Sequence, residues 1–158
     1  MFITQITVYL ENTHGTLRAL TKTLAKENID MLALSVADTA SFGLVRIITR
    51  ENDCDRAFRV LQENGFLARI NHVFCLSVPN EPAGLDRVLE VIEENGIQIE
   101  YMYSFNHNLD GAALMIMRMT KDKNAKGHVA RAADREVIAD ILKKNGITPV
   151  TQSTVNTL

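Results

Sequence analysis

The sequence has few cysteines and no pair of them at a spacing that suggests chemistry. Its 158 residues include two, Cys54 and Cys75, and no CxxC motif. That excludes the common thiolate sites for zinc and for dithiol redox chemistry. Because both fall on apolar faces of a predicted helix and strand, we expect them to be reduced thiols in the core.

Long apolar tracts and an excess of charge are also missing. No apolar stretch has the length of ~20 residues that crosses a bilayer, and Met1 leads into an alternating strand pattern without the basic start of a signal peptide. The net charge of −2 lacks the basic footprint of a nucleic-acid binder. We therefore expect a cytoplasmic protein with neither nucleic-acid nor membrane partners.

Recognisable catalytic constellations are absent as well. We find no Ser/His/Asp or Cys/His set, no glycine-rich phosphate loop and no pair of carboxylates in an apolar setting. The four histidines, His14, His72, His107 and His128, lie in separate segments without metal-ligand spacing. The basic residues between Lys121 and Arg135 are interpreted as a solvated loop. The sequence therefore predicts no enzyme activity, no metal and no cofactor.

What the chain does contain is an internal repeat. Shifted by 68 positions, Ile6–Met31 aligns with Phe74–Ile99 without a gap, and eight apolar pairs coincide. The pairs are Ile6/Phe74, Val8/Leu76, Leu10/Val78, Leu17/Leu85, Leu20/Val88, Leu24/Ile92, Ile29/Ile97 and Met31/Ile99. In each copy the spacing changes from period two to helical, which indicates a strand followed by an amphipathic helix. We predict two domains, residues 1–71 and 72–158.

Each copy is predicted to have the order βαββαβ. In the first, strands are expected at 3–10, 29–37, 43–50 and 66–70, with helices from Gly15 to Asn28 and from about Asp53 to Asn64. In the second, strands are expected at 73–78, 97–105, 112–120 and 147–152, with helices at 84–95 and 134–145. Insertions are expected at 106–111 and 121–133.

This order is that of a ferredoxin-like, split βαβ unit of the α+β class. Because almost no linker separates Ile70 from Val73, we expect the two modules side by side. They would form one eight-stranded antiparallel sheet with the helices on one face.

The turn residues and the element order together resemble the ACT domain, a small-molecule sensing module of amino-acid metabolism. The motif is read in residues 10–17 with Asn28-Ile29-Asp30, and again in residues 78–85 with Gly96-Ile97-Gln98. Residues 37–43 and 100–105 are similar to stand-alone tandem ACT proteins of prokaryotes. The sequence departs from the motif at His14, which replaces a proline, and at Ala83, which takes the glycine position.

A ligand pocket is expected where each copy begins its first helix. The unpaired N–H groups of a helix start suit a carboxylate, and Gly15 and Gly84 would let a ligand approach the backbone. Asn12 and Asn80 can hydrogen-bond an amino acid, and Asp30 can accept from an ammonium group, with Gln98 as its counterpart. Alternatively, the two asparagines only satisfy turn backbone, and Asp30 is a solvated strand end.

We expect two reciprocal pockets shared by the modules, because each helix start lies beside polar side chains. One would use Asn12, His14, Gly15, Thr16 and Leu17, closed by Gln98 or Tyr101. The other would use Asp30 with Asn80, Ala83, Gly84 and Leu85.

The expected function is that of a regulatory protein that binds a small molecule, most simply an amino acid, and regulates a partner enzyme of amino-acid or related carboxylic-acid metabolism. The alternative is a ligand-free structural or regulatory subunit, similar to the small subunit of acetolactate synthase.

A homodimer or larger oligomer is also expected, because strand Ala113–Met119 is apolar on both faces up to Arg118. Met115 and Met117 are expected in that contact between uncovered sheet faces. The alternative is that the chain covers the second face itself.

Overall fold

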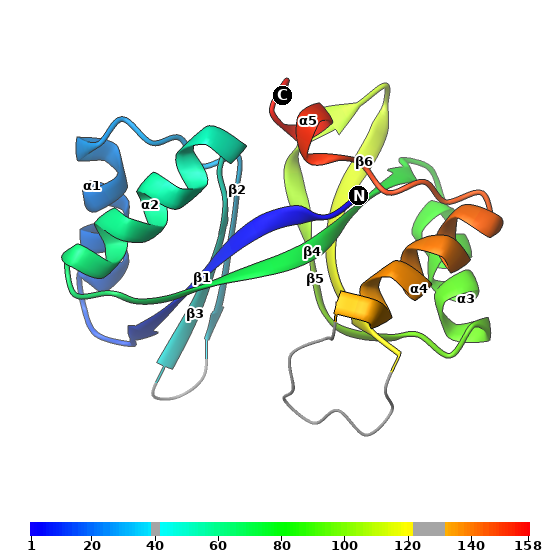
Figure 1. Ribbon diagram of the computed structural model, residues 1–158, viewed down its shortest axis with the longest axis horizontal. Coiled ribbons are helices and arrows are strands. Elements are labelled where there is room, and N and C mark those ends of the chain that lie inside the picture. Colours follow the sequence, from blue (N-terminus) through cyan, green and yellow to red (C-terminus); the bar gives the residue numbers. More distant parts are fainter. Residues whose placement is uncertain (39–41, 122–131) are drawn as a thin grey trace. The chain divides into compact units, whose positions relative to one another are not determined.

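A computed structural model describes residues 1–38, 42–121 and 132–158. The elements, shown in Figure 1, follow in the order β1 (Ile3–Glu11), α1 (Thr16–Lys26), β2 (Ala33–Asp38), β3 (Phe42–Ile48), α2 (Glu51–Glu63), β4 (Leu67–Pro79), α3 (Gly84–Glu94), β5 (Gln98–Leu109), β6 (Ala112–Thr120), α4 (Ala132–Lys144) and α5 (Gln152–Val155). The hydrogen-bonded strand order is β2-β3-β1-β4-β6-β5.

The chain folds into two compact units, and each consists of one long and one short range of the sequence. Unit 1 contains Met1–Ile3 and Val73–Thr151, and unit 2 contains Thr4–His72 and Gln152–Leu158. The chain therefore passes from one unit to the other within β1, within β4 and directly before α5.

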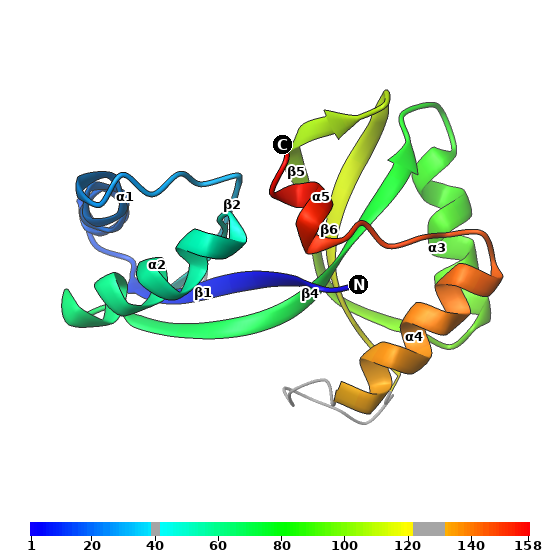
Figure 2. The same cartoon turned by 45° about the horizontal axis from the view of Figure 1, so that its top comes forward.

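In unit 2, alternating residues of β1 and β3 face the helices. Ile6 pairs with Ile47 and Val8 with Val45 across the strands, and all four are buried with Leu20 of α1. Figures 1 and 2 show α1 and α2 on the same side of these strands. Burial of each such side chain contributes about 1.5–3 kcal/mol, so this shared layer holds α1 and α2 on the sheet.

The opposite face of β1 in unit 2 buries polar side chains. Gln5 and Thr7 are buried, and the Gln5 amide donates to the Thr7 hydroxyl at 2.8 Å. The hydroxyl of Thr7 donates in turn to Oδ1 of Asn71 in β4 at 2.9 Å. Because buried polar groups need partners, this chain of hydrogen bonds specifies how the two strands lie together.

Unit 1 repeats the layer with larger side chains. Phe74 of β4 pairs with Met117 of β6, and both are buried beneath α3 and α4 with Val88 and Ile138. At the start of the chain, Phe2 packs edge-on against Phe74, with ring centroids 5.1 Å apart. The first residues are thus part of the core of unit 1.

The predicted helices and the hairpin β2–β3 are confirmed, whereas the eight-stranded sheet is wrong. The strands expected at 66–70 and 73–78 are one continuous strand, β4. The last strand, expected at 147–152, is reduced to a single bridge between Leu76 and Pro149, followed by α5. Pro149 carries no N–H, so it cannot extend a regular ladder.

The other hairpin, β5–β6, differs in its length. β5 continues to Leu109 through the expected insertion at 106–111, with a register shift between Ser104 and Asn108, and turns at Asp110 and Gly111, both with positive φ. Most of the second expected insertion, including His128, lies outside the described residues, as does the side chain of His107.

The residues behind the predicted dimer lie on both faces of β4 and β6. Met117 is buried in the layer beneath α3 and α4, and Met115 packs against that layer. Contrary to the expectation, Met115 and Met117 therefore do not lie on an uncovered sheet face, and the homodimer itself stays a prediction.

Across the described ranges, no helix is both long enough and apolar enough to cross a membrane.

The fit between Gly84 and Pro79 gives a test of the fold. A Cβ on Gly84 would stand 2.0 Å from the carbonyl oxygen of Pro79, whereas one on Gly43 would meet no atom within 4 Å. We expect Gly84→Ala to lower the free energy of unfolding by roughly 2–3 kcal/mol, because α3 must move away from β4. Gly43→Ala should change it by less than about 1 kcal/mol. Equal losses in urea unfolding would contradict the close approach.

Candidate functional site

An open groove of about 850 Å³ lies in unit 2 where β1 ends and α1 begins. The residues that line it come from β1, the following turn, α1, β2 and β3. They are Leu10, Glu11, Asn12, Thr13, His14, Gly15, Thr16, Leu17, Arg18, Ala19, Lys22, Val36, Gly43 and Val45. The structure therefore brings together five predicted residues of the first pocket, Asn12, His14, Gly15, Thr16 and Leu17.

The turn before α1 is shaped by Gly15 and Thr16. Gly15, at the N-cap, has φ 88, a conformation that L side chains rarely adopt. The Thr16 hydroxyl donates to the carbonyl oxygens of Glu11 and Thr13, at 3.0 and 2.9 Å, and so ties the helix start to the end of β1. Gly15 has no side chain with which to cap α1. The first turn thus presents backbone N–H groups beside the groove.

The charged residues of the groove are mainly basic. Arg18 and Lys22 lie one helical turn apart on α1, and Glu11 is the acidic residue among the lining side chains. The first turn of α1 contains no acidic residue, so its own side chains do not offset the positive end of the helix dipole. Leu10, Val36 and Val45 add an apolar wall. This combination can hold an anionic group together with an apolar one.

The second copy has a different helix start. Ala83 takes the N-cap position of α3 with φ 63, and Gly84 is buried against the backbone of Pro79. Glycine is therefore needed here for packing and not for ligand approach. The first turn of α3 contains Asp86, and Arg87 pairs with Glu81 of the preceding turn. Charges in this copy are thus largely paired or offset.

Two depressions of unit 1 contain predicted residues of the second copy. Gly84 lines a depression of about 460 Å³ with Arg87 and Asn145, and Asn80, Ala83 and Leu85 are not among its lining residues. Gln98 lines another depression, at the far end of α3, with Ile97 and Ile99. Tyr101 is half-buried in β5.

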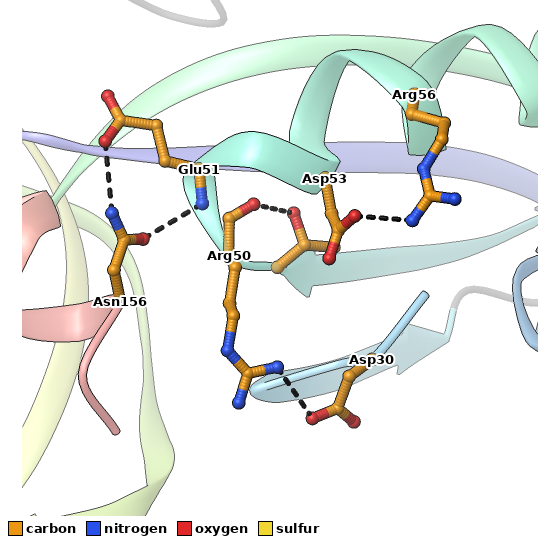
Figure 3. A network of polar contacts seen from close by, with 7 residues as sticks. Asp30, Arg50, Glu51, Asp53, Arg56 and Asn156 are labelled. Atoms are coloured by element: carbon orange, nitrogen blue, oxygen red, sulfur yellow. Dashed lines mark hydrogen bonds and ion pairs between the residues drawn. The ribbon is translucent and has the colours of Figure 1, made fainter. Parts of the chain in front are cut away.

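Asp30 belongs to unit 2 but does not line the groove. It follows the C-terminal end of α1, which spans about 16 Å at 1.5 Å per residue. Its carboxylate accepts from the Arg50 guanidinium at 3.3 Å (Figure 3), and the two side chains are 64% and 42% exposed. An ammonium ligand at Asp30 would compete with Arg50.

Sequence reasoning missed Arg18, Lys22, Val36 and Val45 as lining residues. Arg18 and Lys22 are four residues apart, a spacing that places them on one side of α1 and that could have indicated them. Val36 and Val45 form a cross-strand pair of β2 and β3. Their position beside α1 depends on strand register, which no local sequence pattern specifies.

The two thiols are buried, and the pKa of each is raised, so little reactive thiolate forms at neutral pH. Burial, with the Asp55 charge, raises the pKa of Cys54 from 9.0 to about 11 against the smaller effect of a hydrogen bond with Thr49. Burial alone raises the pKa of Cys75 to about 12. In the part of the chain that the structure describes, no three His, Cys, Asp or Glu side chains group as a metal site.

A thiol-labelling experiment tests this reading. At pH 8 the native protein should react with DTNB at least ~100-fold more slowly than the urea-unfolded chain, since a pKa two units higher leaves a hundredth of the thiolate. Because the pKa values of both thiols are higher in the folded than in the unfolded chain, their contribution to the free energy of unfolding is fully present below pH 9. It is lost as the pH rises from 9 toward 11 and above. Rapid labelling of either cysteine in the native protein would contradict its burial.

The two helix starts allow a reciprocal stability test. Ala83→Gly should raise the free energy of unfolding by about 0.5–1 kcal/mol, because an L residue is strained at φ 63. Gly15→Ala should lower it by a similar or larger amount, although space for the methyl group is open. Changes of the same sign in thermal unfolding would contradict a left-handed backbone at both N-cap residues.

Comparison with known proteins identifies the fold. The family model "ACT domain pair" matches residues 1–148. A solved protein from Bacteroides thetaiotaomicron is 32% identical, with 100% of this chain and 98% of that chain covered and a TM-score of 0.81. A search of curated proteins finds no match.

More distant structures share the fold alone. The regulatory subunit of aspartate kinase from Thermus thermophilus, in its ligand-free form, is 15% identical, with 85% and 90% of the two chains covered and a TM-score of 0.54. The corresponding subunit from Thermus flavus is 12% identical, with 72% and 80% covered and a TM-score of 0.53. Together with the family match and the two repeated helix starts, these findings confirm the resemblance read from the sequence: the chain belongs to the family of ACT domain pairs.

Proposed function

We propose that this ACT domain pair is a regulatory protein without catalytic activity that binds an amino acid or a related carboxylic acid in the groove of unit 2. The observation that carries the proposal is the groove itself, where the start of α1, Arg18 and Lys22 line the same space as an apolar wall. The family adds support, since the resemblance implies sensing of small molecules.

The ligand's carboxylate would bind at the start of α1. Backbone N–H groups of the first turn would donate to it, and Arg18 would add a charge-assisted hydrogen bond. An apolar side chain of the ligand would pack against Val36 and Val45. Asn12 and Glu11, on the turn, would bind the polar remainder, including an ammonium group if one is present.

We propose that the second copy has a structural role, in keeping with the ligand-free alternative for that half of the chain. Gly84 is packed against Pro79, and Arg87 is paired with Glu81, so this helix start is committed to contacts within the protein. One ligand per chain is therefore expected. A partner enzyme of amino-acid metabolism would respond to whether the ligand is bound. The name of a protein of similar fold, the regulatory subunit of aspartate kinase, supports this part of the proposal.

A ligand screen followed by two matched variants tests the proposal. A thermal-shift screen against the twenty amino acids and their 2-oxo acids should give a stabilised melting temperature with at least one compound. Arg18→Ala should then weaken binding of that compound about tenfold or more in calorimetry, by loss of a charge-assisted contact. Arg59→Ala, an exposed arginine of α2 outside the groove, is the control. No stabilisation by any compound, or equal affinity of both variants, would count against the groove.

A further inference from the structure

The last seven residues, Gln152–Leu158, form a segment that sequence analysis did not anticipate. They include α5 and lie beyond residues 1–148, the part matched by the family model. They follow Thr151, the last residue of unit 1, yet they belong to unit 2. The segment therefore follows unit 1 directly in the sequence but packs as part of unit 2.

Its main contact is made by Asn156 at the beginning of α2 (Figure 3). Oδ1 of Asn156 accepts from the backbone N–H of Glu51 at 2.9 Å, and its Nδ2 donates to Oε2 of Glu51 at 3.1 Å. Glu51 is the first residue of α2, and the N-cap residue, Arg50, gives no side-chain cap. Asn156 thus supplies, from 105 positions away, an acceptor for one of the first N–H groups of α2, which have no partner within the helix.

Gln152 makes a second contact, at the start of the unit 2 part of β1. Its Oε1 accepts from the backbone N–H of Thr4 at 2.9 Å, and its Nε2 donates to Oδ1 of Asn156 at 3.3 Å. Val155, between them, is fully buried. The buried Val155 and the hydrogen bonds to Thr4 and Glu51 therefore hold the segment in unit 2.

The same helix start positions Arg50. Its carbonyl oxygen accepts from the Asp53 N–H and from the Thr49 hydroxyl, each at 3.0 Å, and its guanidinium donates to Asp30. Loss of the Asn156 cap would loosen the first turn of α2 and, with it, the backbone that aims Arg50 at Asp30.

We propose that Gln152–Leu158 is a latch, a conformational device that closes on the first turn of α2 and on Thr4 and that opens while both units stay folded. Opening exposes Val155 and breaks the hydrogen bonds to Thr4 and Glu51, which water can replace. Neither Arg50 nor Asp30 lines the ligand groove, so the latch does not rest on the proposed function.

Amide hydrogen exchange, followed residue by residue by NMR on the full chain, tests the latch. Val155→Asp, which disfavours the buried anchor, should accelerate exchange at both Thr4 and Glu51 at least tenfold. Asn156→Ala should do so at Glu51. The amides of Ala57 in α2 and Met117 in β6 should exchange as in the unchanged protein. Thr157→Ala is the control, because its hydroxyl donates to Thr154 within the segment itself.

Two results would overturn the proposal. If Thr4 and Glu51 keep their exchange rates in Val155→Asp, the segment does not protect them. If Ala57 and Met117 accelerate together with Glu51 in both Val155→Asp and Asn156→Ala, the segment is an inseparable part of the global fold and no latch exists.

Discussion

The constraint on which this structure depends is the continuity of β4. Its first half, Leu67–His72, belongs to unit 2, and its second half, from Val73 to Pro79, belongs to unit 1. Because β4 belongs to both units, the core of each unit contains side chains from only one half of this strand. Ala68 is buried in the core of unit 2 and Phe74 in that of unit 1. The end of β4 then sets where α3 can begin, since the Pro79 carbonyl oxygen lies against Gly84.

From this constraint follows the difference between the two helix starts. α1 and α3 begin at Thr16 and Gly84, positions that the sequence repeat aligns, and both have an N-cap residue with positive φ. In the first copy the turn is open, and the basic residues of α1 line a groove. In the second copy glycine is used for backbone packing, and an ion pair closes the turn. The same local fold is thus kept while the capacity for an anion is concentrated in one copy.

Much of this was predictable, because apolar periodicity carries most of the information about helices and strand faces. The repeat located α1 and α3 and the turn residues Asn12, Gly15 and Thr16. It could not show that residues 66–70 and 73–78 join into one strand. The residues between them, Asn71 and His72, can continue a strand or interrupt it, and the apolar pattern does not distinguish the two cases. Asp30 follows the C-terminal end of α1 and pairs with Arg50, and Gln98 follows that of α3. Their roles in pockets shared by the two modules stay predictions.

The contacts of the C-terminal segment Gln152–Leu158 could not be predicted from sequence patterns, for a related reason. Gln152 and Asn156 have no periodic signature, and their partners, Thr4 and Glu51, are distant in sequence. Such long-range capping becomes apparent only when the fold places the two segments together.

The central claim is that this ACT domain pair holds one carboxylate ligand per chain, at the start of α1. The most direct measurement is an NMR titration of the ¹⁵N-labelled protein with the compound that stabilises it most. The account predicts saturation at one ligand per chain, with the largest amide shifts from Asn12 to Ala19 and at Val36, Gly43 and Val45, and little change from Glu81 to Arg87. Saturation at two ligands per chain, or the largest shifts at the start of α3, would contradict it.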